Sequence, residues 1–299
     1  MRTTVNFKSR DGEACKDDVP GRGTYARFGR EVMELVDAMI KAEGLTKRYG
    51  SFDALNGLNL KVMPGEIYGL LGPNGAGKTT TLKITAGLIE PTTGSVIVSG
   101  FDATRDSLHA KTKIGYVAEI PILYDSLTPR ELLEFEASVR RLAKDPMNRR
   151  AGQLAEAFGV VSVFDSPIGT LSMGTKQKVA IIAALLHQPP VLLLDEPLNS
   201  LDAKSSRILR ELLSLHVQRG GAVLFSTHIM EIAQTLCSRI GIIYEGKVVA
   251  EGDLDQLRAR TGEKDATLET VFMKLTNEAS EVENIVRTLR ESFFDNEGR

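Results

Sequence analysis

From about residue 38, short apolar runs alternate with segments in which apolar residues recur at helical spacing. Three runs have the length and composition of buried strands, at residues 66–72, 191–197 and 222–228. A helical pattern follows each run, at residues 78–87, 203–219 and 229–239. Buried strands separated by helices predict a mostly parallel α/β sheet.

Two further patterns complete the predicted core. Residues 38–45 and 57–65 have strand patterns with polar turns, which indicates an antiparallel start, and residues 240–252 predict a closing hairpin. A helical insert interrupts the alternation over about residues 120–185. Its first helix has Thr128 as N-cap, Pro129 at the first helical position and Glu131 at the third, which is the pattern of a capping box.

The two ends of the chain differ from this core. Residues 1–38 are polar and lack periodicity, so we expect either a disordered extension or a mis-assigned start, with Met33 or Met39 as the true first residue. Residues 39–262 are expected to form the main domain. Residues 263–299 predict a helical C-terminal tail, with a final helix over about 280–294.

Composition excludes several classes of protein. The 299 residues include 37 basic and 39 acidic side chains, so a strongly basic nucleic-acid footprint is absent and no nucleic-acid partner is expected. Cys15 and Cys237 are too few for a disulfide framework, which favours a reducing cytosol. No apolar run approaches the ~18 to 20 residues of a spanning helix, so a role at a membrane requires a separate partner.

The clearest chemical motif follows the strand at 66–72. It fits the phosphate-loop pattern G-x-x-x-x-G-K-[ST] with Gly72, Pro73, Asn74, Gly75, Ala76, Gly77, Lys78 and Thr79. The glycines allow backbone N–H groups to turn toward phosphate oxygens, and the dipole of the next helix favours the same anion. We expect Lys78 to reach the β and γ phosphates, Thr79 to bind Mg²⁺, and Thr80 to complete the nucleotide contact.

A pair of acids follows the apolar strand that begins at Val191. This strand should bring Asp195 to the carboxyl edge of the sheet, beside the phosphate loop. Asp195 is then expected to hold Mg²⁺, and Glu196 to act on the attacking water as general base.

With these motifs in order, the chain resembles the ATP-binding cassette family from about Met39 to Asp253, specifically the nucleotide-binding subunit of an ABC transporter. The resemblance implies that Tyr49 stacks on adenine and that Glu119 contacts Mg²⁺ and the attacking water. It also implies that Ser172 and Gly174, in "LSMGTKQK", bind the γ-phosphate of a second subunit's ATP. Asp202, in "LNSLDAKS", matches the family's D-loop, and His228, in "STHIMEI", would contact the γ-phosphate and align Glu196 with the water.

The chain also departs from the family pattern. Glu119 stands where the family has glutamine, Met173 and Thr175 stand within the signature segment, and Ser200 replaces a common glycine. An ionised carboxylate at position 119 can bind Mg²⁺ but cannot donate a hydrogen bond. Ser172 is also expected as an ordinary N-cap, and this is compatible with anion binding at the same helix N-terminus.

The resemblance implies an α/β fold with a P-loop, RecA-like core of mostly parallel sheet, an antiparallel β sub-domain and the helical insert. It implies hydrolysis of ATP with Mg²⁺ in a head-to-tail dimer of two cassettes, on the cytoplasmic face of a membrane. A separate permease, of export type by family analogy, would dock near Ile120, Ile122, Leu123 and Tyr124. A soluble non-transport cassette ATPase, a degenerate ATP-binding regulatory subunit and a small-molecule kinase remain as alternatives.

Overall fold

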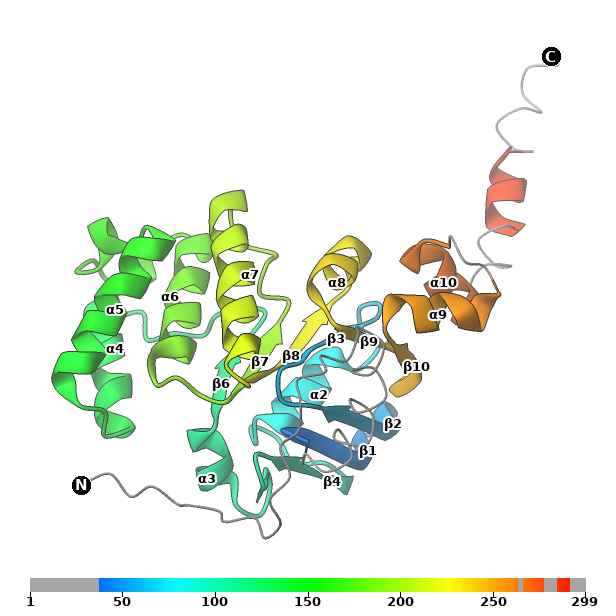
Figure 1. Cartoon of the computed structure of the whole chain (residues 1–299), viewed down its shortest axis with the longest axis horizontal. Helices are drawn as coiled ribbons and strands as arrows, with labels where there is room; N and C mark the ends of the chain where they lie inside the picture. The colour runs from blue at the N-terminus through cyan, green and yellow to red at the C-terminus, as the bar shows by residue number, and fades with distance from the viewer. Residues whose placement is uncertain (1–37, 263–265, 277–283, 291–299) are drawn as a thin grey trace, which may run out of the picture. The chain divides into compact units, whose positions relative to one another are not determined.

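The computed structural model describes residues 38–262, 266–276 and 284–290 (Figure 1). The expectation for residues 1–37 lies outside this range, as do the ends of the helix expected over 280–294; residues 284–290 are helical. In the described ranges, no helix combines the length and the apolar character required to cross a bilayer.

A six-stranded sheet forms the centre of the fold, in the order β10-β9-β3-β8-β7-β6. Its strands are β3 (Ile67–Leu71), β6 (Ile114–Val117), β7 (Val191–Asp195), β8 (Ala222–Thr227), β9 (Arg239–Tyr244) and β10 (Lys247–Gly252). The first five run parallel, and β10 pairs antiparallel with β9 as the predicted closing hairpin. The predicted mostly parallel sheet is therefore confirmed.

Both faces of this sheet are buried, which explains the continuous apolar runs of its strands. Tyr68, Leu193 and Leu224 point to one face and pack with the antiparallel sheet and α2 (Lys78–Thr85). Leu192 and Phe225 belong to the core on the opposite face, which includes residues of α5 (Lys144–Phe158), α6 (Met173–Leu186) and α7 (Ala203–Gln218). The phosphate loop thus joins a fully buried strand to a helix packed against the sheet.

An antiparallel sheet of four strands packs on the first face, in the order β2-β1-β4-β5. Its strands are β1 (Ile40–Tyr49), β2 (Phe52–Val62), β4 (Thr93–Val98) and β5 (Phe101–Asp102), and α3 (Ser107–Thr112) follows. The predicted antiparallel start is confirmed by the pairing of β1 with β2.

The helical insert contains α4 (Pro129–Val139), α5 (Lys144–Phe158) and α6 (Met173–Leu186), drawn in green in Figure 1. Two short 3₁₀ helices, Val161–Val163 and Ile168–Thr170, connect α5 with α6. The predicted capping box starts α4. The Glu131 N–H donates to Thr128 Oγ1 at 3.2 Å, and the Thr128 N–H donates to Glu131 Oε2 at 2.8 Å.

Beyond the insert, and apart from the helical residues 284–290, the described ranges contain four helices: α7 (Ala203–Gln218), α8 (Met230–Leu236), α9 (Leu254–Thr261) and α10 (Leu268–Leu275). The last of these lies within the segment expected as the tail. Its residues Leu268, Val271 and Phe272 are buried in one cluster with Ile240 and Ile242 of β9. The helix α10 is therefore packed onto the main sheet.

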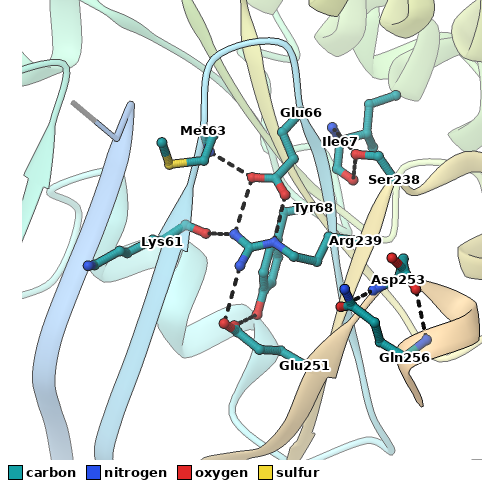
Figure 2. Close-up of polar contacts among 10 residues, drawn as sticks. All are labelled: Lys61, Met63, Glu66, Ile67, Tyr68, Ser238, Arg239, Glu251, Asp253 and Gln256. Atoms are coloured by element: carbon teal, nitrogen blue, oxygen red, sulfur yellow. Dashed lines mark hydrogen bonds and ion pairs between the residues drawn. The ribbon is translucent and has the colours of Figure 1, made fainter. Parts of the chain in front are cut away.

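A polar cluster around Arg239 joins the two sheets (Figure 2). Arg239 pairs with Glu66 at 2.7 Å and with Glu251 at 3.2 Å, and its guanidinium also donates to the Lys61 carbonyl of β2. The Tyr68 hydroxyl donates to Glu251 at 2.9 Å. Burial, and then the Glu251 carboxylate, raise the pKa of Tyr68, so it stays a neutral donor. Side chains from β3, β9 and β10 are thereby fixed to the backbone of β2.

Candidate functional site

The phosphate-loop sequence forms a tight turn between β3 and α2. Gly75 has φ +84° and Gly77, the N-cap of α2, has φ +109°, a region that strains other residues. At Gly72 a Cβ atom would overlap the carbonyl oxygen of Ile243. The glycines therefore permit both the left-handed turn and the close approach of β9.

The Lys78 ammonium folds back into this loop. It donates to the carbonyl oxygens of Gly72 at 2.7 Å and Pro73 at 3.1 Å, and it lies 3.5 Å from Glu196 Oε1. Lys78 is only 5% exposed. A buried cation in a glycine-rich loop at the N-terminus of a helix is suited to an anionic ligand.

A pocket of about 410 Å³ opens at the loop. The lining combines residues from several separate sequence motifs with residues, such as Phe52, that belong to none of these motifs. Its lining comprises Tyr49, Phe52, Ala54, Pro73, Asn74, Gly75, Gly77, Lys78, Thr79, Thr80, Glu119 and Glu196. Tyr49 is 49% exposed, and Phe52 on the neighbouring strand is 59% exposed. Two exposed rings at the mouth of a polar pocket offer surfaces for a planar base. Phe52 had no motif to identify it in the sequence.

The acid pair lies at the carboxyl end of β7. Asp195 and Glu196 are 1% and 4% exposed. Ser226 Oγ donates to Asp195 Oδ1 at 2.6 Å and accepts from the Glu196 N–H at 3.1 Å. Glu196 has φ +46°, a left-handed conformation that is strained for this residue type. The buried oxygens Asp195 Oδ2 and Glu196 Oε2 have no hydrogen-bond partner among the described residues.

These unpartnered oxygens test whether the site fits a divalent cation. Buried carboxylate oxygens without donors are costly unless a cation or water neutralises them. Asp195 supplies one such oxygen, while the Thr79 hydroxyl and the Glu119 carboxylate belong to the adjoining pocket. Oxygen donors of this kind are the ligands that Mg²⁺ prefers, so the residues fit the ion.

His228 follows β8 and meets the acid pair. Its Nδ1 lies 2.9 Å from Glu196 Oε1, while the side chain is 44% exposed. Tyr116 of β6 is a further neighbour that the sequence analysis did not propose. Burial raises its pKa first, and the charges of Asp195 and Glu119 raise it further, so the phenol remains neutral beside the acids.

Several motif residues are not part of the pocket lining: Gly72, Ala76, Asp195, His228, Ser172, Gly174 and Asp202. Ser172 is exposed and caps α6, because its Oγ accepts from the Thr175 N–H at 3.3 Å. Asp202 is exposed and caps α7 through the Ser205 N–H at 2.8 Å. Its hydrogen bond from Lys178 at 2.6 Å, and then that from Ser205, lower its pKa. Each of these two residues therefore lies at the solvent-exposed N-terminus of a helix.

Gly174 connects these two motifs. A Cβ atom at Gly174 would come within 2.6 Å of the Ser200 carbonyl oxygen, and Lys178 of α6 binds Asp202. The start of α6 and the segment before α7 therefore form one surface. Only a small residue at position 174 allows their close approach.

Comparisons with known proteins agree on one family. The family model described as "ABC transporter" matches residues 55–199. The probable multidrug ABC transporter ATP-binding protein YbhF of Escherichia coli (strain K12) is 38% identical over 284 residues, covering 92% of this chain and 48% of that protein. The bacitracin transport ATP-binding protein BcrA of Bacillus licheniformis is 37% identical over 226 residues, covering 75% of this chain and 73% of that protein.

A solved structure shares the fold. It is a dimeric, post-hydrolysis state of an ATP-binding cassette with ADP and phosphate bound, and it matches with a TM-score of 0.66 and 29% identity. The match covers 72% of this chain and 99% of that one. The chain spans about half the length (48%) of YbhF, whereas it covers most of BcrA.

Proposed function

The chain belongs to the ATP-binding subunits of ABC transporters, a family of ATPases, and on this basis we propose that its pocket binds MgATP and hydrolyses it to ADP and phosphate. One observation carries the assignment. The exposed ring of Tyr49, the phosphate loop and Glu196 all line a single pocket, and Glu196 is hydrogen-bonded to His228.

Binding uses the two ends of the pocket. Tyr49 stacks on the adenine, with Phe52 beside it, and the phosphates occupy the loop between β3 and α2. The Lys78 ammonium exchanges its bonds to the Gly72 and Pro73 carbonyls for bonds to phosphate oxygens. An ionised acceptor forms the stronger hydrogen bond, so this exchange favours binding.

The metal would be held by Thr79, Asp195 and Glu119. When bound, Mg²⁺ neutralises charge on the phosphate oxygens. The residues of the chain supply the remaining chemistry. Glu196 accepts a proton from a water molecule whose oxygen attacks the γ-phosphorus, and the bond to the β–γ bridging oxygen breaks. His228 orients Glu196 through their 2.9 Å contact.

The outward-facing motifs support a dimer. Ser172, Gly174 and Asp202 are placed on one surface, and the phosphate pocket of the same chain does not include them. A second copy, related by a two-fold axis, would bring this surface to the first copy's ATP. The related cassette with ADP and phosphate is dimeric, which supports the same arrangement.

The exposed apolar residues of the helical insert support a permease partner. Ile120, Ile122 and Tyr124 are 62%, 91% and 59% exposed. They adjoin a groove of about 510 Å³ whose lining includes Ile122 and Leu123. A contiguous apolar surface of this kind indicates a protein contact. We propose that a transmembrane permease binds here on the cytoplasmic face, and the multidrug and bacitracin relatives favour export.

The test compares wild type with Glu196→Gln in the full-length chain. We expect wild type to release phosphate from MgATP, and Glu196→Gln to lose about a hundredfold or more of that rate while retaining ATP binding. Light scattering should show the ATP-bound variant as a dimer. Glu231→Gln, an exposed acid on α8, is the matched control and should behave as wild type. ATP binding without hydrolysis by wild type, alone and with its permease, would favour the degenerate regulatory subunit instead.

A further inference from the structure

A second pocket, of about 250 Å³, lies behind the phosphate loop. Its lining is mostly apolar and comes from three parts of the chain: Leu71, Gly72, Pro73, Asn74, His228, Met230 and Phe272. Phe272 belongs to α10, beyond every motif that identifies the family. An aromatic ring of the C-terminal segment therefore lines the same pocket as the histidine that contacts Glu196.

The helix α10 is firmly held. Leu268, Val271 and Phe272 are 1%, 0% and 5% exposed, and they share a buried cluster with strands β9 and β10. Near the end of β10, Glu251 is hydrogen-bonded to Arg239, and the capping box of Asp253 and Gln256 then starts α9 (Figure 2). Phe272 is thus fixed relative to the sheet that carries the acid pair.

The phosphate loop and the His228 segment differ in how they are restrained. The loop has its own backbone bonds, from Gly72 N–H to the Thr227 carbonyl at 3.3 Å and from Gly246 N–H to the Ala76 carbonyl at 3.0 Å. His228 contacts Glu196 through one ring nitrogen and is otherwise half-exposed. Met230, two residues later, packs against the same cluster as Phe272. The backbone next to His228 is also restrained, because the Ile229 N–H donates to Thr227 Oγ1 at 3.0 Å, so the apolar contacts around the pocket bear mainly on the position of the His228 ring.

We propose that Phe272 is a positioning residue for ATP hydrolysis, and that α10 holds the His228 segment so that the imidazole meets Glu196. The inference rests on the proposed function of the site. It also gives the C-terminal segment a role, because any partner that displaces α10 would slow hydrolysis without touching the nucleotide.

Truncation of the ring tests this proposal in the full-length chain. Phe272→Ala should lower kcat for MgATP by about tenfold and leave KM within about twofold, because the loop keeps its own restraints. Val271→Ala is the matched control. It removes side-chain volume from the same buried cluster, but Val271 does not line the pocket, so this variant should keep the wild-type kcat. Phe272→Leu should restore most of the rate. If Phe272→Ala does not fold, Met230→Ala across the pocket should show the same loss.

A second measurement does not depend on turnover. The chain has four histidines, so isotope labelling of their rings gives few signals, and His228→Gln identifies one of them. The His228 signal should shift in Phe272→Ala and stay in place in Val271→Ala. Equal kcat losses in the two variants, or an unmoved His228 signal, would overturn the positioning role. A wild type without ATPase activity would instead count against the proposed function, and the histidine signal would still decide this inference.

Discussion

The two sets of motif residues differ most in their burial. Lys78, Asp195 and Glu196 are 5%, 1% and 4% exposed, and they contact one another or share a neighbour. Ser172 and Asp202 are exposed, and their side chains cap the helices α6 and α7. Lys78 and Glu196 of the first set line a pocket within one chain, whereas the second set lies on the surface.

This difference indicates which part of the reaction a single chain can perform. The buried set already has the cation, the acids and the space that a nucleotide phosphate needs. The exposed set lies at helix N-termini, and we propose that the anion they bind is the ATP held by a second copy. Loss of the buried Lys78 cation should therefore weaken ATP binding as well as turnover, whereas variants in the second set should lower turnover alone.

The largest effect is expected at Lys78. Lys78→Ala removes the buried cation of the pocket, so ATP binding should weaken and the hydrolysis rate should fall about a thousandfold. Lys83→Ala, on the same helix α2, should remain near wild type. Nucleotide titration and phosphate release measure the two steps. Hydrolysis by Lys78→Ala near the wild-type rate would remove the buried set from the mechanism.

A smaller effect, on turnover alone, is expected at Ser172. Aspartate and asparagine both cap helices well, so Ser172→Asp and Ser172→Asn should melt at similar temperatures. Only aspartate places a negative charge against the partner's ATP, and it should lower kcat by about a hundredfold relative to asparagine. Both variants should still bind ATP. Equal rates for the two variants would reduce Ser172 to a helix cap.

The two ends of α6 allow a further contrast, measured as stability. At its C-terminal end His187 lies 3.1 Å from the Ile114 carbonyl, and burial lowers the pKa of His187 to about 4. The unfolded chain takes up this proton first, near pH 6.5. The contribution is therefore complete above about pH 6.5 and is lost as the pH falls through about 4. We expect this contribution of His187 to the free energy of unfolding to be about 2 kcal/mol, a value reduced because part of the ring is exposed to solvent.

Urea unfolding between pH 4 and 7 measures this contribution. His187→Gln should flatten the pH dependence of the unfolding free energy by about that amount. His109→Gln, at a side chain that is 68% exposed and lies outside α6, is the control for replacing a histidine. If the free energy of unfolding depended on pH equally in His187→Gln and in wild type, burial of a neutral His187 would not stabilise the C-terminal end of α6.

The smallest effect is expected on the outer surface of the helical insert. Ile122→Asp places a charge on the groove proposed for the permease, and recovery of the chain with membranes of its source organism should fall roughly fivefold. Val161→Asp changes an exposed residue elsewhere in the insert and is the control. ATPase activity of the isolated chain should not change in either variant. Equal recovery of both variants would place the permease contact elsewhere.

The elements that the sequence predicted correctly are those that have a local pattern, such as the continuous apolar run of a buried strand. The strands at β3, β7 and β8 are apolar throughout because both sheet faces are covered, and the capping box at Thr128 is a local signal. No element was predicted between residues 101 and 117. The strand β6 has only four residues and contains Gly115, where a Cβ atom would overlap the Ala184 carbonyl of α6. The need for glycine at position 115 comes from the backbone of α6, which is far away in the sequence, so it produces no pattern in the residues around Gly115.

The site was predictable to the same extent. The phosphate loop and the acid pair are short motifs, and Tyr49, Glu119 and His228 came from the family resemblance. The roles of these residues remain predictions. Phe52, Tyr116 and Phe272 were missed because each contributes through a contact with residues far away in the sequence. The left-handed conformation of Glu196 likewise depends on Ser226 and has no signature of its own.

The central claim is that each chain supplies a pocket to one ATP and its exposed motif surface to the other. The most direct test mixes two inactive full-length variants, Lys78→Ala and Ser172→Asp. In a mixed dimer the intact pocket of one chain meets the intact Ser172 of the other, so one of its two sites is complete. Half of the dimers in an equal mixture are mixed, so we predict a return of about a quarter of the wild-type ATPase rate. A mixture as inactive as its two components would contradict the shared site.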